Sequence, residues 1–428
     1  MEKVTFEALL DGRWHHAATL EFADAARGRR GLCFLEYAQD YLDAWQATGR
    51  LDAAVSLTLP LEWGPATCAR WPAFLDDLRP MGNARRWWLH RLRLADGDES
   101  DLRLLREGTA APIGNVRVAE SVPLERVRPR RFPLRDVVER EHDFIAWAAD
   151  HGAQVGGATG AGGESPKLLL RREGDEVWID VSQDEPGNAA AHVLVKFPRG
   201  KTARDHLILR SEFVYYRALA QLGVDTIAAP GLELHEGEGG PSLWLPRFDV
   251  QREGGREVRF GVESMYSLLS AEAGARLRHQ DVLAALKKYV PDDAWPALLV
   301  EYVRRDVLNL VFGNSDNHGR NTAVLKRADG VQLAPVYDFA PMKMDPEGII
   351  RTTTWGPFER GGEVDWRALL PTFGVHEAEV REGLRSLSAK LGELPELLRA
   401  LGLPAETLDF PSLGLRQTAQ RLKTWGLT

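Results

Sequence analysis

The sequence predicts an α+β fold of two lobes, one small and rich in strands and the next mainly helical, with an additional small α/β domain before them. At 428 residues the chain is too long for one ordinary domain. After residue 165, short apolar runs alternate with Gly, Asp and Asn turns, which is typical of antiparallel strands. From residue 264 the apolar positions recur at helical spacing. We place the three parts at residues 1–125, 126–246 and 247–428.

Composition and charge indicate which classes of protein this chain can belong to. Hydrophobic residues make up 44% and charged residues 27%, as in ordinary soluble proteins. No apolar run approaches the roughly 18 residues that span a bilayer, and residues 1–10 lack a signal pattern, so we expect a cytoplasmic protein without a membrane partner. A net charge of −8 argues against DNA binding through the overall field. Cys33 and Cys68 lack metal-finger spacing and are expected to be free thiols.

Local patterns predict the elements of the first part and its junction with the second. Residues 54–61 alternate between apolar and polar side chains, which predicts a strand. Residues 71–78 predict a short amphipathic helix. Three prolines and an arginine run over 118–135 are typical of a linker between domains. Residues 136–151 can place their apolar side chains on one helical face.

The two lobes follow in order. Residues 168–171, 177–181 and 192–197 predict an antiparallel meander. A helix over 202–222 and a strand over 243–248 complete the strand-rich lobe. The helical lobe is predicted to contain helices at 264–273, 279–288, 295–312, 378–391 and 394–401.

A polar loop, GNSDNHGRN over residues 313–321, directly follows the strongly apolar helix that ends at Phe312. It contains a D-x4-N pattern from Asp316 to Asn321. A predicted hairpin comes next, with its turn at 328–330, and Asp338 follows in the sequence YDF. The loop is therefore expected to be held at the end of a rigid, buried element, with the second aspartate brought back to it by the hairpin.

This layout is what phosphoryl transfer requires. A transferring γ-phosphoryl group needs a carboxylate that orients the attacking hydroxyl and accepts its proton, and we assign Asp316 to that role. Magnesium prefers carboxylate and amide oxygens, which Asn321 and Asp338 supply. His318 is a further candidate catalytic residue or a brace for the loop. The alternative is that these side chains only cap loops and helices, as Asp and Asn often do.

A glycine-rich segment upstream, VGGATGAGGESPK over residues 155–167, lets backbone N–H groups approach phosphate. It lacks the GxxxxGK[ST] pattern, so it is not a Walker loop. We expect it to fold over ATP, with Gly160, Gly162, Gly163, Ser165 and Lys167 as nucleotide-binding residues.

Lys196 ends an apolar strand, where its ammonium can neutralise phosphate oxygens. Glu212 is a carboxylate on the otherwise apolar face of the helix predicted at 202–222. Burying it unpaired is unfavourable, so Lys196 is its expected partner. This is the strand-lysine to helix-glutamate pair of protein kinases.

Several motifs, in the same order, resemble the HipA family of bacterial serine/threonine kinases. The loop GNSDNHGRN resembles the catalytic loop of that family, and PVYDF resembles its magnesium-binding segment. RSEFVYYRALAQLGV resembles the helix that carries the paired glutamate, and LPRFDV resembles the hinge strand. The stretches LTLPL, FLDDLRP and LLREGTAAPIGNVRV resemble its small N-terminal domain. The resemblance covers nearly the whole chain.

The resemblance implies a two-lobed, protein-kinase-like fold and an ATP- and Mg²⁺-dependent toxin of a type II toxin–antitoxin pair. Such kinases phosphorylate a protein, in studied members an aminoacyl-tRNA synthetase, and so arrest growth. A small helix-turn-helix antitoxin of HipB type would be the partner, so that DNA is reached only through the antitoxin. Backbone groups near Pro246 and Phe248 would hold adenine, and Ser165 or Thr159 would be autophosphorylated.

Two other classes remain open at this point. One is a metal-dependent hydrolase built on Asp316, His318 and Asp338, which would need a metal with imidazole affinity but not ATP. The other is a kinase-fold transcriptional co-repressor with little catalysis. The intact set of kinase-type residues argues against the second, and the glycine-rich segment argues against the first.

Overall fold

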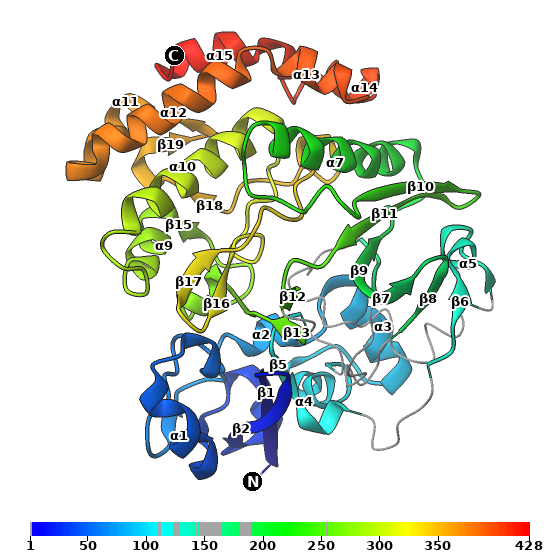
Figure 1. Cartoon of the computed structure of the whole chain (residues 1–428), viewed down its shortest axis with the longest axis vertical. Helices are drawn as coiled ribbons and strands as arrows, with labels where there is room; N and C mark the ends of the chain where they lie inside the picture. Colours follow the sequence, from blue (N-terminus) through cyan, green and yellow to red (C-terminus); the bar gives the residue numbers. More distant parts are fainter. Residues whose placement is uncertain are drawn as a thin grey trace.

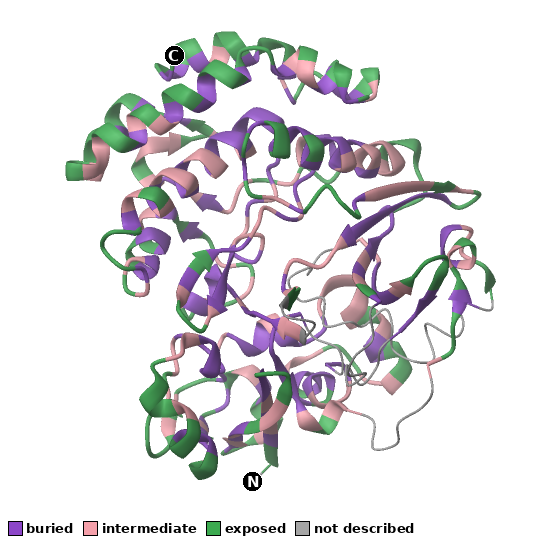
Figure 2. Cartoon of the chain, viewed as in Figure 1, coloured by how far each residue is buried: buried purple, intermediate pink, exposed green. Residues whose placement is uncertain are grey.

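The computed structural model describes residues 2–109, 113–122, 129–142, 144, 165–179, 190–253 and 256–428. Figure 1 shows the N-terminal domain, in blue, against one end of two lobes, with the helices of the second lobe at the opposite end. Figure 2 shows that buried residues line the inner faces of these elements and exposed ones the outer faces. Within the described residues no helix is both long and apolar enough to cross a membrane.

The N-terminal domain is built on an antiparallel sheet in the order β4-β3-β2-β1-β5. Alternate residues of β1, from Val4 to Leu10, are buried in its core, as expected for a sheet with one face covered. The strands are β1 Glu2–Leu10, β2 Arg13–Phe22, β3 Cys33–Tyr37, β4 Ala66–Cys68 and β5 Val116–Val118. The helices are α1 Gln39–Trp45, α2 Leu75–Leu78, α3 Gly82–Leu92 and α4 Asp98–Glu107.

Two predictions in this domain need correction. Residues 54–61 do not form a strand but a tight turn, closed by the Leu59 N–H donating to the Ser56 carbonyl at 3.1 Å. The turn lies at the junction of two domains, so Val55 packs into the core of the N-terminal domain and Leu57 into the core of the helical lobe. Glu263 of the helical lobe accepts hydrogen bonds from this turn. The helix expected over 71–78 is only the four-residue α2, since Pro72 and the preceding residues are not helical.

The strand-rich lobe contains a sheet in the order β10-β11-β9-β7-β8-β6. The predicted antiparallel pairing is confirmed, but the order is not that of a simple meander. β7 pairs with both β8 and β9, so β9 returns to the other side of β7 and a central strand results. The strands are β6 Phe132–Pro133, β7 Lys167–Glu173, β8 Glu176–Trp178, β9 Ala191–Lys196, β10 Glu233–Gly237 and β11 Gly240–Pro246.

The helix expected over residues 136–151 begins earlier and is interrupted. α5 spans Leu134–Val138 and ends in a turn where Arg140 has a φ of 56°, a left-handed value that a helix cannot continue through. Residues 145–151 of the expected helix lie outside the described residues.

The long helix α7 covers Ala203–Gln221, which confirms the helix predicted over 202–222. A capping box starts it: Thr202 Oγ1 accepts the Asp205 N–H at 3.2 Å, and Asp205 Oδ2 accepts the Thr202 N–H at 3.0 Å. Its inner face buries Leu209, Tyr215 and Leu219.

Thr202→Ala removes one half of this capping box and is expected to lower the free energy of unfolding by about 1 kcal/mol. Thr424→Ala is the matched control, because Thr424 is an exposed threonine inside helix α15, where its hydroxyl donates to the Gln420 carbonyl at 3.0 Å and does not cap the start of the helix. Urea denaturation of both variants measures the difference. Equal stabilities for the two variants would contradict a capping role for Thr202.

The helical lobe confirms most of its predicted elements. The helices are α8 Met265–Leu268, α9 His279–Leu286, α10 Trp295–Phe312, α11 Trp366–Leu369, α12 Glu377–Leu391, α13 Leu394–Ala400, α14 Ala405–Leu408 and α15 Thr418–Trp425. α8 is much shorter than the helix expected over 264–273, because Ser270 adopts a φ of 51° just after it.

The predicted hairpin is confirmed as β16 Ala323–Arg327 and β17 Gly330–Leu333, joined to a third strand in the order β14-β16-β17. The remaining strands form two-stranded pairs outside the main sheets. They are β12 Val250–Glu253 with β13 Arg256–Arg259, β15 Leu277–Arg278 with β18 Thr353–Thr354, and β19 Glu359–Arg360 with β20 Glu363–Val364; β14 spans Gly261–Ser264.

Candidate active site

The predicted pair between Lys196 and Glu212 is confirmed as a contact. Lys196 is the last residue of β9, which is paired on both sides, and Glu212 lies on the buried face of α7. Lys196 Nζ donates to Glu212 Oε2 at 2.6 Å, and both residues are buried. The Tyr216 hydroxyl donates to the other carboxylate oxygen at 3.0 Å, so both oxygens of Glu212 are satisfied.

Lys196 also reaches Asp338, across the cleft between the lobes. Its Nζ lies 2.5 Å from Asp338 Oδ1, while Lys167 Nζ lies 3.2 Å from Asp338 Oδ2. Lys167 stands directly opposite Lys196 in the pairing of β7 with β9, which is why both ammoniums point at one carboxylate. Sequence patterns placed Lys167 near phosphate but did not indicate this contact.

Burial and charge set the protonation of this group. Burial opposes ionisation of Asp338, but the ammoniums of Lys167 and Lys196 outweigh it and hold the pKa of that carboxyl well below its usual range. Burial likewise opposes the charge on Lys196, yet Asp338 and Glu212 raise the pKa of its ammonium. For Lys167 burial dominates and lowers the pKa. Asp338 is therefore an ionised carboxylate, and its backbone has a φ of 51°, an uncommon value that Asp tolerates better than most residues.

The loop over residues 313–321, the predicted catalytic loop, follows α10 through Gly313, whose φ of 70° caps the helix. Within the loop Asn321 Nδ2 donates to the Asp316 carbonyl at 2.7 Å, which closes the D-x4-N segment on itself. The Asp316 carboxylate is partly exposed, with His318 Nε2 at 3.6 Å from its Oδ1. Burial lowers the pKa of His318 despite the nearby Asp316 and Asp338 charges, which favours the neutral imidazole.

A pocket opens between the lobes beside these groups. Of the predicted residues, the ones that line it are Lys167, Lys196, Glu212, Pro246, Phe248 and Asp338. Its other walls are mainly apolar, as suits a flat heterocycle, and Phe248 stacks on Tyr337 with ring centroids 5.4 Å apart. The N–H of Arg247 is already used by the sheet, since it donates to the His192 carbonyl at 3.1 Å.

The N-terminal domain contributes Ile113 to the same pocket, which sequence reasoning missed. An apolar residue in a connecting segment carries no pattern that would reveal such a role. Thr159, Gly160, Gly162 and Gly163 lie outside the described residues. Ser165 is described at the entry to β7, where it is half-buried.

Comparison with known families identifies the chain. Residues 159–393 match the model of the HipA-like C-terminal domain, and residues 15–119 match the model of the HipA N-terminal domain. The chain belongs to the HipA family.

A solved structure confirms the predicted fold class, a two-lobed α+β fold with an additional N-terminal domain. HipA in the Shewanella oneidensis MR-1 complex with HipB and operator DNA superposes with a TM-score of 0.70 at 17% identity, covering 98% of this chain and 97% of that one. The Helicobacter pylori proinflammatory kinase CtkA covers 62% of this chain and 89% of its own at 13% identity. Its TM-score of 0.40 is too low to support any argument.

A relative in sequence is the putative kinase Y4mE of Sinorhizobium fredii, 29% identical over 192 residues. The match covers 42% of this chain and only 41% of that relative's length. It therefore relates part of this HipA-family chain to part of that protein.

The side chains present fit a magnesium ion. Asn321 Oδ1 is buried and has no hydrogen-bond partner among the described residues, while its amide nitrogen is fixed by the loop. Together with the ionised Asp338 it offers only oxygen ligands, the kind that magnesium prefers. By contrast, no three His, Cys, Asp or Glu side chains of the described residues group as a metal site. The hydrolase built on Asp316, His318 and Asp338 therefore lacks its expected ligand cluster.

Proposed function

We propose that this HipA-family chain is an ATP- and Mg²⁺-dependent serine/threonine protein kinase. The observation that carries the proposal is the buried Lys196, held between Glu212 of the first lobe and Asp338 of the second at the wall of an apolar pocket. Such a shared lysine has no evident structural purpose that an apolar residue would not serve, because burying charged pairs rarely adds stability.

The residues divide the work of phosphoryl transfer between them. Phosphate oxygens of ATP can replace Asp338 as partners of Lys196 and Lys167, which frees that carboxylate. Asn321 and Asp338 would then hold Mg²⁺, which when bound neutralises charge on the phosphates. Asp316 orients the substrate hydroxyl and takes its proton as the oxygen attacks the γ-phosphorus. The bond from that phosphorus to the bridging oxygen breaks, and ADP leaves with the electron pair.

The direct test is incubation of the purified chain with ATP and Mg²⁺ beside candidate substrates, with phosphorylated residues located by mass spectrometry. An aminoacyl-tRNA synthetase is the first substrate to test, and growth arrest on expression is the expected cellular effect. Phosphoserine or phosphothreonine on a second protein supports the proposal. ATP hydrolysis without any phosphorylated protein would contradict it.

Asp338→Ala is expected to weaken ATP binding in the presence of Mg²⁺ by roughly tenfold or more, since it removes a ligand of the ion. Chelating Mg²⁺ should produce the same loss in the unmodified chain and little further loss in the variant. Calorimetric titration with ATP measures both. Asp329→Ala, which removes a carboxylate at the exposed hairpin turn, is the control. Equal ATP affinity with and without Mg²⁺ in both chains would exclude the assignment.

Autophosphorylation of the glycine-rich segment is proposed at Ser165 or Thr159. A phosphate there would add about −1.5 to −2 charge beside the ATP phosphates and disfavour nucleotide binding. Peptide mapping after prolonged incubation with ATP and Mg²⁺ distinguishes the two hydroxyls. If the segment stays unmodified while an external substrate is phosphorylated, autophosphorylation is refuted and the kinase proposal is unaffected.

A helix-turn-helix antitoxin of HipB type is the proposed partner in the cytoplasm. The Shewanella relative of this fold was solved as a complex of HipA, HipB and operator DNA. The net charge of −8 argues that this chain would reach DNA only through such a partner. We expect the chain to co-purify with a helix-turn-helix protein encoded next to it. Operator binding should be lost when that protein is absent.

A further inference from the structure

We propose that the N-terminal domain positions the catalytic loop, and that Arg320 is the positioning residue through which it does so. The inference rests on the proposed kinase function, which it extends to a domain that holds none of the residues assigned to the chemistry.

Arg320 belongs to the catalytic loop but places its side chain in the N-terminal domain. The residue is 4% exposed, and its Nη2 donates to the Asp76 carbonyl of α2 at 3.1 Å. Its Nε lies 3.8 Å from Asp77 Oδ1. Burial raises the pKa of the Asp77 carboxyl to about 6, and the Arg320 guanidinium limits that rise, so at neutral pH the contact joins opposite charges.

The backbone of the same residue joins both halves of the active site. The Arg320 N–H donates to His318 Nδ1 at 3.3 Å, and the Arg320 carbonyl accepts a bond from the Tyr337 hydroxyl. Tyr337 directly precedes Asp338, and Arg320 directly precedes Asn321. A shift of Arg320 would therefore disturb both segments that carry the proposed magnesium ligands.

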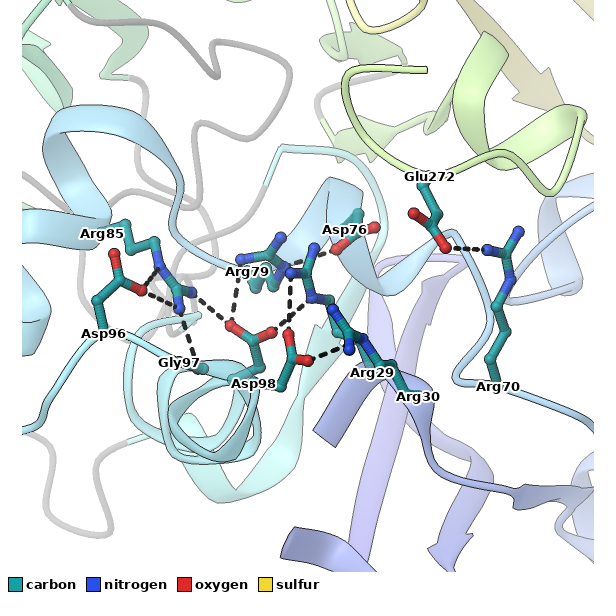
Figure 3. A network of polar contacts seen from close by, with 11 residues as sticks. Arg29, Arg30, Arg70, Asp76, Arg79, Arg85, Asp96, Gly97, Asp98 and Glu272 are labelled. Atoms are coloured by element: carbon teal, nitrogen blue, oxygen red, sulfur yellow. Dashed lines mark hydrogen bonds and ion pairs between the residues drawn. The ribbon is translucent and has the colours of Figure 1, made fainter. Parts of the chain in front are cut away.

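The part of α2 that holds Arg320 is itself rigidly held. Figure 3 shows Asp76 in a network of arginines and aspartates that ties α2 to the rest of the N-terminal domain. Asp76 Oδ1 accepts from Arg79 Nε at 2.6 Å, and Arg79 Nη1 lies 3.3 Å from Asp101 Oδ1. Asp101, fully buried on α4, also contacts Arg29 at 2.8 Å and Arg85. Bonds of this kind in a buried network leave α2 little freedom to move.

The position of Asp77 is fixed from the helical lobe as well. Its Oδ2 accepts the N–H of Ser264, the residue that caps the start of α8, at 2.8 Å. The α2 segment is thus bonded both to its own domain and to the second lobe. The Arg320 side chain is therefore bound by a rigidly held segment of the N-terminal domain, while its backbone belongs to the loop over 313–321.

Other contacts dock the domain independently of Arg320. The buried Glu263 accepts from Ser56 Oγ at 2.6 Å and from the Leu57 N–H at 2.8 Å. The buried Lys326 donates to the Ala54 carbonyl at 2.9 Å. These bonds hold the turn over 54–58 against the second lobe. Substituting Arg320 should therefore loosen the catalytic loop while the domain stays docked.

The test compares Arg320→Gln and Arg320→Lys with Arg70→Gln as a matched control. Arg70 crosses the same interface, where it contacts Glu272 at 2.6 Å (Figure 3) and the Ser270 carbonyl at 2.5 Å. Among the described residues these are its polar partners, and neither belongs to the loop over 313–321. Because displacing catalytic groups by about 1 Å can cost on the order of 100-fold, we expect Arg320→Gln to lower kcat by about 10- to 100-fold. Arg320→Lys should recover part of this, and Arg70→Gln should stay within about twofold.

Two further measurements separate positioning from a general loss of structure. The KM for ATP should change less than kcat in Arg320→Gln, since Arg320 itself does not line the nucleotide pocket. Combining Arg320→Gln with Asp77→Asn should lower kcat by less than the product of the single effects, because the two side chains act together. A kcat for Arg320→Gln within about twofold of the unmodified chain, or an equal loss in Arg70→Gln, would overturn the proposal.

Hydrogen exchange distinguishes failure of this inference from failure of the kinase proposal. Amides of residues 313–321 should exchange faster in Arg320→Gln than in Arg70→Gln, whether or not the chain transfers phosphate. Unchanged exchange rates in that segment would overturn the proposal that Arg320 positions the loop. Absent phosphoryl transfer in the unmodified chain, together with faster exchange, would overturn only the kinase assignment.

Discussion

Asp316→Asn is expected to reduce phosphoryl transfer by about 100- to 10,000-fold, the usual contribution of a general base. The amide has nearly the shape of the carboxylate but cannot accept the proton of the attacking hydroxyl. The bond that closes the loop, from Asn321 Nδ2 to the Asp316 backbone carbonyl, does not involve the substituted atoms. The loss should therefore come from chemistry and not from a rearranged loop.

The same variant should bind ATP within about threefold of the unmodified chain, since Asp316 does not line the nucleotide pocket. Single-turnover transfer measured beside calorimetric ATP binding tests both halves of this prediction. Asp329→Asn provides the control for loss of a negative charge at an exposed turn of the same lobe. Transfer at a near-normal rate by Asp316→Asn would remove that residue from the mechanism.

The parts of the site that could be predicted from the sequence are those whose physical requirements are visible among neighbouring residues. Glu212 interrupts an apolar helical face, and such a carboxylate needs a partner, so its pairing with Lys196 could be inferred before any coordinates. The hairpin between Asn321 and Asp338 has a turn sequence of its own. In both cases the physical requirement is contained within a few neighbouring residues.

The parts that could not be predicted depend on partners distant in the chain. The alternation over 54–61 correctly indicates burial, but the segment is a turn at the junction of two domains, where Glu263 and Lys326 bind it, and not a strand of a sheet. The contact of Lys167 with Asp338 follows from its register opposite Lys196, which a sequence pattern does not fix. Arg320 looked like an ordinary polar loop residue, since nothing near it in sequence indicates that α2 would receive its side chain.

The Lys196–Glu212 pair carries the second large expected effect, on stability as well as activity. Lys196→Met leaves the Glu212 carboxylate, 1% exposed, with the Tyr216 hydroxyl as its hydrogen-bond donor, and removing one partner of a buried pair typically costs about 3–5 kcal/mol. Glu212→Gln should lower the free energy of unfolding by less, because Lys196 Nζ still has Asp338 Oδ1 as a partner at 2.5 Å. Each variant should also lose most phosphoryl transfer, since Lys196 would no longer be held toward the phosphates.

The double variant distinguishes a functional unit from two separate residues. Combining Lys196→Met with Glu212→Gln removes both charges, so its loss of unfolding free energy should be smaller than the sum of the single losses by about 1–3 kcal/mol. Transfer by the double variant should be no slower than by Lys196→Met alone, because a glutamate without its lysine has nothing left to position. Urea denaturation and single-turnover kinetics on all four chains give both quantities. Strictly additive losses would mean that the 2.6 Å contact between these side chains does not act as a pair in solution.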